Sequence, residues 1–174
     1  QGLSRVDLNR TGDLLFENFS HDPNDPENSL PFNQLTVLKE MGDHLYIGSR
    51  RGLFAFNYKS QQFKDLNQSI SRYRITSLEQ SGATKLWGST KKGLFSYNTK
   101  TEKFHLFDSH EELGGFIYES GASSKDKSGS LYFASKWGIT KFRPALIKTN
   151  TNPAPVVITE VKKLSPKKEF ISTA

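Results

Sequence analysis

Cysteine is absent from this chain of 174 residues, and methionine occurs only once. Without cysteine, the chain can form neither disulfide bonds nor thiolate metal sites. Long apolar runs are missing too, since no stretch approaches the roughly 20 residues that a membrane-spanning helix requires. The sequence shows no signal peptide, and Gln1 falls in the middle of a repeating pattern. We therefore expect an excised piece of a longer protein, which would contact a membrane only through a transmembrane segment outside this chain.

Motifs of catalysis and metal binding are equally scarce. The sequence has no nucleophile elbow, phosphate-binding loop or zinc-protease motif. Its four histidines are spread over three repeats without metal-ligand spacing, and the acidic run at residues 22–27 lacks the glycine and the distal glutamate of an EF-hand loop. Glu111 and Glu112 are adjacent, which is typical of a solvated loop. We predict that the chain is not an enzyme and that it has no metal site and no cofactor.

Aromatic residues, by contrast, are plentiful. Thirteen Phe, six Tyr and two Trp compensate for a hydrophobic share of only 34%, because each aromatic side chain buries a large area. Helix signals are few, and the apolar residues are mostly aromatic or β-branched, which favours sheet. The net charge of +6 permits an anionic partner. The basic residues are spread along the chain without an RNA-binding signature, so we predict no nucleic-acid partner.

One sequence unit recurs three times. It reads LYIGSRRGLFAFN at residues 45–57, LWGSTKKGLFSYN at 86–98 and LYFASKWGITKFR at 131–143, and residues 2–7 match its second half. The glycines that anchor the unit are spaced by 50, 41 and 45 residues, a period typical of four-stranded propeller blades. These anchors are Gly2, Gly52, Gly93 and Gly138.

Each unit reads as successive strands. An apolar segment and a turn precede the strand that holds Tyr46, Trp87 or Tyr132, and a glycine-led strand with a period of two follows. We predict an all-β fold, a partial β-propeller of four-stranded antiparallel blades with about three and a half repeats. The predicted boundaries are a half blade at 1–29 and further blades at 30–70, 71–112 and 113–148.

Two positions of the unit are small or hydroxylated in every copy. The crowding of blades near a propeller axis explains the small residue, and we expect the hydroxyl after it to bond the backbone of the next turn. The small residues are Gly48, Ser89 and Ala134, and the hydroxylated ones are Ser49, Thr90 and Ser135.

The repeats resemble the two-component regulator propeller family. The resemblance rests on residues 18–30, on 45–49 with Gly52 and Leu53, and on residues 129–144, which look like that family's closing blade. Residues 153–161 resemble the first strand of the triple-tyrosine, immunoglobulin-like domain that follows the propeller in these receptors. We therefore expect residues 149–174 to form a linker and the truncated start of such a domain.

The resemblance implies a role in signalling. It implies the periplasmic, ligand-sensing region of a bacterial transmembrane receptor, a hybrid two-component histidine kinase or a diguanylate cyclase, whose output domain is not in this chain. Related receptors often bind oligosaccharides. The repeat motif is structural, however, and no family binding residue can be matched to this sequence.

Basic residues recur in the turn before the anchoring glycine, as a pair in the first two complete units and as Lys136 followed by Trp137 in the third. Equivalent turns of successive blades lie side by side on one face of a propeller, and loops that join blades reach the same face. This arrangement favours either solubilised tight turns or a face that binds an anionic or carbohydrate ligand through charge and ring stacking. The candidate binding residues are Arg50, Arg51, Arg72, Tyr73, Arg74, Lys91, Lys92, Lys136 and Trp137.

Three functions compete at this point. The first is a ligand-sensing module, and the second is a structural or interaction propeller that mediates receptor dimerisation without a small ligand. The third, a propeller enzyme, needs histidines or acids that converge on the axis, and the sequence shows none. An incomplete propeller also exposes strand edges. We therefore predict self-association through blade edges, and pairing of the strand at residues 156–161 with such an edge.

Overall fold

The fold is taken from a computed structural model. It describes residues 1–9, 13, 15–26, 28–66, 73–107 and 117–147, together with the backbone of residues 161–163 and 169–171. The described chain contains strands and one short 3-10 helix, Pro144–Leu146, but no α-helix. This result confirms the all-β prediction.

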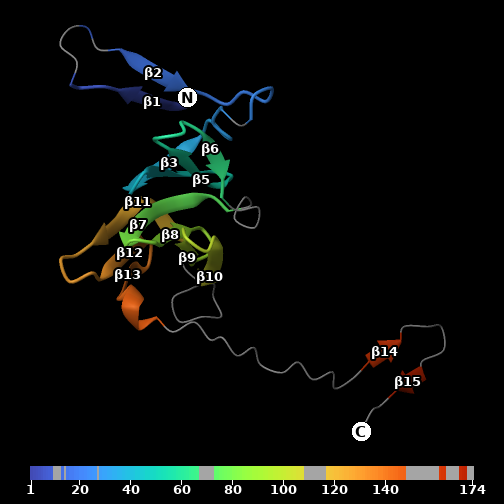
Figure 1. The fold of residues 1–174 in the computed structure, drawn as a ribbon. Helices are drawn as coiled ribbons and strands as arrows, with labels where there is room; N and C mark the ends of the chain where they lie inside the picture. Colours follow the sequence, from blue (N-terminus) through green and yellow to red (C-terminus); the bar gives the residue numbers. More distant parts are fainter. Residues whose placement is uncertain are drawn as a thin grey trace.

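Two complete four-stranded sheets form the centre of the molecule (Figure 1). Both are antiparallel meanders in chain order, and the aromatic and β-branched residues of the repeat supply their buried faces. The first sheet consists of β3 (Leu35–Met41), β4 (His44–Ser49), β5 (Gly52–Asn57) and β6 (Phe63–Asp65). The second consists of β7 (Ile75–Ser81), β8 (Lys85–Thr90), β9 (Leu94–Asn98) and β10 (Lys103–Phe107).

Incomplete sheets flank this pair. An N-terminal hairpin of β1 (Leu3–Val6) and β2 (Phe16–Phe19) has the place of the two outer strands of a blade. In the described part of the chain the third sheet has three strands, β11 (Tyr118–Lys125), β12 (Leu131–Ser135) and β13 (Gly138–Phe142). The succession of these sheets is that of a partial β-propeller.

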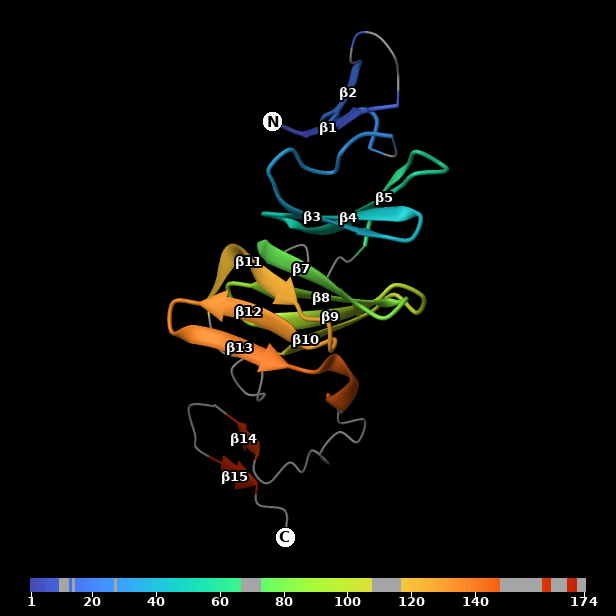
Figure 2. The ribbon, with the colours of Figure 1, turned by 90° about the vertical axis from the view of Figure 1, so that its left-hand side faces the viewer.

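The first strands of the three larger sheets are neighbours, as the two ribbon views show (Figures 1 and 2). Polar bonds join them across the sheet boundaries. The Thr36 hydroxyl donates to the carbonyl of Ile75 at 2.7 Å, and the Ser77 hydroxyl donates to the carbonyl of Glu119 at 3.4 Å. β3, β7 and β11 therefore form the inner edge of the propeller.

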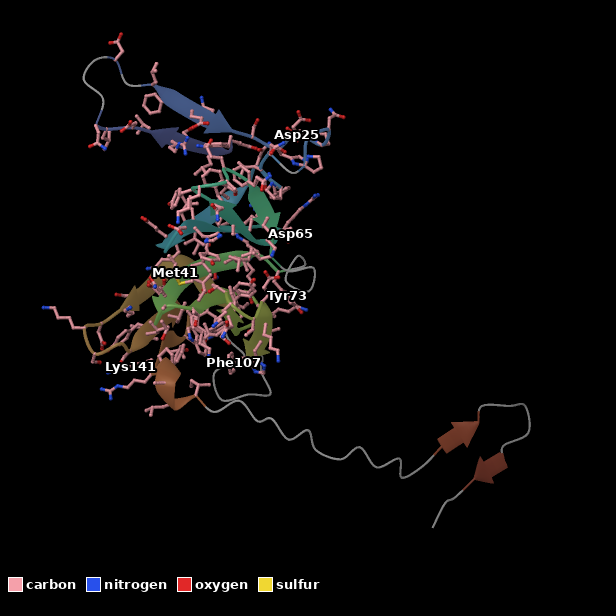
Figure 3. All side chains as sticks on the ribbon, viewed as in Figure 1. Asp25, Met41, Asp65, Tyr73, Phe107 and Lys141 are labelled. Atoms are coloured by element: carbon pink, nitrogen blue, oxygen red, sulfur yellow. The ribbon has the colours of Figure 1, made fainter. Side chains whose placement is uncertain are left out.

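Apolar side chains fill the space between successive sheets (Figure 3). Between the first and second sheets, Tyr46 packs with Leu86, Phe95 and Tyr97. Between the second and third, Trp87 packs with Phe107 and Phe142. The N-terminal hairpin joins the first sheet through its Phe19, whose ring centroid lies 5.3 Å from that of Phe56. Aromatic residues thus hold one blade to the next.

The predicted tail strand at residues 156–161 lies almost wholly outside the described residues. Its last residue, Val161, opens β14 (Val161–Lys163), which pairs antiparallel with β15 (Glu169–Ile171). At Val161 the partner is therefore Ile171, where we had expected the edge of a blade.

Candidate functional site

The same tight turn follows the second strand of each larger sheet. In the first sheet the Ser49 hydroxyl donates to the carbonyl of Gly52 at 3.2 Å and accepts the amide of Arg51 at 2.9 Å. Thr90 makes the equivalent bonds to Gly93 and Lys92, at 3.1 and 2.9 Å. The expected bond from the hydroxyl to the turn backbone is confirmed.

The third turn repeats the arrangement. The Ser135 hydroxyl donates to the carbonyl of Gly138 at 3.1 Å and accepts the amide of Trp137 at 3.2 Å. The closing glycine has a positive φ in every copy, 127° at Gly52, 150° at Gly93 and 141° at Gly138. Glycine adopts such angles without the steric cost of a Cβ atom. The hydroxyl and the glycine therefore hold the backbone of the turn. The two central side chains take no part in forming it and can extend from the surface.

All three turns lie at one end of the sheets. Ser49 is opposite Leu35 at the start of β3, Thr90 is opposite Ile75 at the start of β7, and Ser135 is opposite Tyr118 at the start of β11. Because these inner strands are neighbours, the turns share the end at which the chain enters each sheet. In Figure 2 this end of the third sheet, where β12 turns into β13, lies to the left. We call this end the cationic face.

Two arginines from different sheets line one hollow of the cationic face. Arg50 comes from the turn after β4, and Arg74 directly precedes β7. The hollow has a volume of about 510 Å³, and Gln34 and Thr36 also line it. Gln1 lines the hollow as well. It directly precedes Gly2, just as Arg51 precedes Gly52, so it occupies the matching turn position of the N-terminal repeat. The Nε atom of Arg74 is buried and has no hydrogen-bond partner.

Two other basic side chains of this face lie over aromatic rings. The Arg51 guanidinium lies 4.6 Å from the centre of the Phe32 ring, and the Lys92 ammonium lies 5.3 Å from the centre of the Tyr73 ring. Lys92 therefore covers one face of the Tyr73 ring, which we had predicted to stack on a ring of the ligand. Phe32 was missed in the sequence, because it lies between two repeats and belongs to no recurring motif.

The predicted binding residues differ in how far they are exposed to solvent. Lys91, Lys136 and Trp137 are exposed at the turns, and Trp137 is 67% accessible. Arg72 lies outside the described residues, whereas Tyr73 and Arg74 are half-buried. Among the described residues, none of the predicted basic residues takes part in an ion pair. Whether these residues bind a ligand stays a prediction.

Among the described residues, no group of three or more histidine, aspartate or glutamate side chains is placed to hold a metal ion. Within that part of the chain, no helix has the length and hydrophobicity to cross a bilayer.

Known structures resemble this fold at low sequence identity. No protein-family model and no curated protein matches the chain. Among solved structures, it is similar to the extracellular domain of BT3049 from B. thetaiotaomicron, described as a hybrid two-component system, with a TM-score of 0.61 and 18% identity over 91% of this chain. The extracellular domain of BT4673 from the same organism gives TM-scores of 0.58 and 0.60 at 17% and 19% identity, over 92% and 90% of this chain, in two structures described as a hybrid two-component and a one-component system.

These likenesses concern the fold. The chain spans 24% of the BT3049 domain and 18% and 20% of the two BT4673 chains. It therefore corresponds to about a fifth to a quarter of each extracellular domain.

Proposed function

We propose that this chain is part of the extracytoplasmic, ligand-sensing region of a bacterial transmembrane signalling receptor. The parent is of the hybrid histidine kinase or diguanylate cyclase type. The proposal is supported by the repeat resemblance and by the likeness of the fold to extracellular domains described as parts of two-component and one-component systems. The sensing part of such a receptor needs a surface that distinguishes ligands, and the cationic face supplies one.

The hollow between Arg50 and Arg74 is the observation that carries this proposal. Two guanidinium groups without ion-pair partners among the described residues line about 510 Å³ of space. Guanidinium groups bind carboxylate, sulfate and phosphate oxygens through paired, charge-assisted hydrogen bonds. The ligand class is therefore anionic, for example an acidic sugar, with Trp137 as an exposed ring for stacking.

Titration calorimetry tests this proposal. The chain is titrated with uronate-bearing and sulfated oligosaccharides and with their neutral counterparts. We expect the acidic sugars alone to bind, and binding to weaken about tenfold or more in Arg50→Ala, since a charged hydrogen bond contributes about 1.5–3 kcal/mol. Lys100→Ala is the matched control, because it removes one exposed positive charge from the turn after β9, at the opposite end of the sheet. Equal losses in both variants, or a preference for neutral sugars, would contradict the proposal.

A second candidate function is supported by the third sheet. Among the described residues this sheet has three strands, and its last strand β13 carries Ile139 at 69% exposure beside the exposed Trp137. An apolar edge strand offers unpaired backbone groups to another chain. The alternative is therefore a structural propeller that mediates receptor dimerisation without a small ligand. It predicts concentration-dependent dimers and no saturable sugar binding.

A further inference from the structure

A second hollow lies between the first and second complete sheets, at the end opposite the cationic face. It has a volume of about 500 Å³, within the range of about 300–1,000 Å³ typical of small-molecule sites. Tyr46 of β4 and Ala55 of β5 form one wall, and Tyr97 of β9 forms the other. Phe63 and Leu66 add apolar surface.

The equivalent place between the second and third sheets is occupied by the protein itself. There Trp87 takes the position of Tyr46 and is fully buried, stacked on Phe107 at 5.2 Å and packed on Phe142 at 4.8 Å. The repeat can therefore close this space with a larger ring. A tryptophan fills the space between the second and third sheets, whereas a hollow remains beside Tyr46 between the first and second. The hollow is therefore not a necessary result of the propeller architecture.

An ion pair joins the two walls of the hollow. The ammonium of Lys64, on β6, lies 2.5 Å from a carboxylate oxygen of Glu102, in the turn between β9 and β10. The two side chains are 59% and 54% exposed. Exposed pairs of this kind contribute only about 0–1 kcal/mol, so a ligand that offers both charges can replace each partner at little cost.

The backbone at Glu102 has a conformation that favours glycine. Its φ is 55°, in the left-handed region that glycine adopts most easily. Gln61 occupies the matched position of the preceding turn, with a φ of 57°, but it does not line the hollow. The turn after β9 thus keeps a carboxylate at a position where glycine would be less strained.

The two tyrosines in the walls of the hollow are uncharged. Burial raises the pKa of Tyr46, and burial, reinforced by the nearby Glu102 carboxylate, raises the pKa of Tyr97 to about 12. Both hydroxyls therefore stay protonated at physiological pH. The walls of the hollow combine aromatic and aliphatic surface with the polar side chains of His44, Asn57 and Gln62. With one positive and one negative group at its rim, such a hollow matches a molecule that has both charges and an apolar part.

We propose that this hollow binds a small zwitterion, an α-amino acid with an apolar side chain. The ligand's carboxylate pairs with Lys64 and its ammonium pairs with Glu102. Its side chain packs on Phe63, Leu66 and Tyr97. The site is separate from the cationic face and does not depend on it, because the ligand is neutral overall and the residues that bind it lie at the other end of the blades.

Calorimetry with L-phenylalanine and L-leucine tests the proposal on the full chain. Hydrocinnamate and phenethylamine keep the phenyl ring of phenylalanine but carry one charge each, and glucose serves as a neutral polyol. We expect saturable binding of the amino acids, and binding about tenfold weaker or undetectable for the three other probes. Equal binding of a singly charged analogue, a preference for glucose, or no saturable binding up to about 10 mM would overturn the proposal.

Two glycine substitutions separate binding from folding. Glu102→Gly removes the carboxylate and relieves the left-handed backbone, so we expect an unfolding temperature no lower than that of the wild type and a loss of amino-acid binding of about tenfold or more. Gln61→Gly makes the same backbone change in the matched turn and leaves the hollow intact, so binding should be unchanged. Full binding by the Glu102→Gly variant would overturn the proposal, as would equal losses in both variants.

Discussion

The ammonium of Lys39 lies 2.7 Å from a carboxylate oxygen of Glu79, across the boundary between the first two complete sheets. The other carboxylate oxygen of Glu79 accepts a hydrogen bond of 3.0 Å from the Ser123 hydroxyl of the third sheet. Glu79 is 8% exposed. One nearly buried carboxylate therefore ties together the inner strands β3, β7 and β11.

These interactions predict that removing the positive charge of Lys39 destabilises the protein. Lys39→Met leaves the Glu79 carboxylate nearly buried without its counter-charge, and we expect it to lower the free energy of unfolding by about 1–3 kcal/mol. Lys59→Met is the control, because Lys59 and its partner Asp43 are 77% and 57% exposed, so its effect should stay within about 0.5 kcal/mol. Urea unfolding measures both, and equal effects of the two substitutions would contradict the role of Glu79.

The hydroxyl of the repeated turn gives a second prediction. Thr90→Val keeps the shape of the side chain but removes the hydroxyl that bonds the Gly93 carbonyl and the part-buried amide of Lys92. The Gly93 carbonyl still accepts the backbone amide of Thr90 at 2.8 Å. We therefore expect a loss of about 0.5–1.5 kcal/mol in the free energy of unfolding. Ser60→Ala, at an exposed turn position, should change it by less than about 0.5 kcal/mol. An unfolding midpoint unchanged by Thr90→Val would refute this account of the turn.

The small residue before that hydroxyl gives a third prediction. A Cβ atom on Gly48 would lie 2.6 Å from Cγ1 of Val37 and 2.8 Å from Cγ2 of Ile75 in the next sheet. Gly48→Ala should therefore push two sheets apart at the inner edge and cost about 1–3 kcal/mol. Ala134→Ser, at the half-buried matched position of the third sheet, should be tolerated within about 0.5 kcal/mol. Thermal unfolding of both variants checks this difference.

The pH dependence of stability provides a fourth prediction. The hydrogen bond from the Ser128 hydroxyl, together with bonds from the Ser130 amide and the Tyr132 hydroxyl, lowers the pKa of Asp126 from 3.8 to about 2. Because the folded-state pKa lies below the unfolded one, this stabilisation is fully present above about pH 4 and is lost as the pH falls towards 2. Asp126→Asn should therefore unfold with a weaker pH dependence between pH 4 and pH 2. If the free energy of unfolding falls equally in both proteins between pH 4 and pH 2, Asp126 makes no such contribution.

The open edge of the third sheet gives a fifth prediction. If β13 mediates self-association, dynamic light scattering of the wild-type chain at micromolar concentration should show dimers or larger species. Ile139→Glu places a charge on this edge and should reduce them. Lys141→Glu changes the charge of the same strand without removing an apolar side chain, and it should have a smaller effect. A monodisperse wild-type monomer would refute the prediction.

The sequence by itself determined the strands and the turns of this protein. Apolar alternation and glycine spacing placed the repeats, because strand periodicity and left-handed turns are local properties of the chain. The hydroxyl that bonds the turn backbone could be predicted for the same reason, since Ser49 and the Gly52 carbonyl are only three residues apart. That the basic turns share one end of the sheets followed from antiparallel connectivity.

Only the tertiary structure decided which residues of different repeats meet. Arg50 and Arg74 line one hollow because β3 and β7 are neighbours, a relationship that no local pattern encodes. The contrast between Tyr46 and Trp87 is of the same kind. Both occupy one position of the repeat, but only the packing of the next sheet shows that the first leaves a hollow and the second fills it. Local sequence fixes the conformation of a strand or turn, whereas the contents of an interface depend on the side-chain volumes of two segments that are distant in sequence.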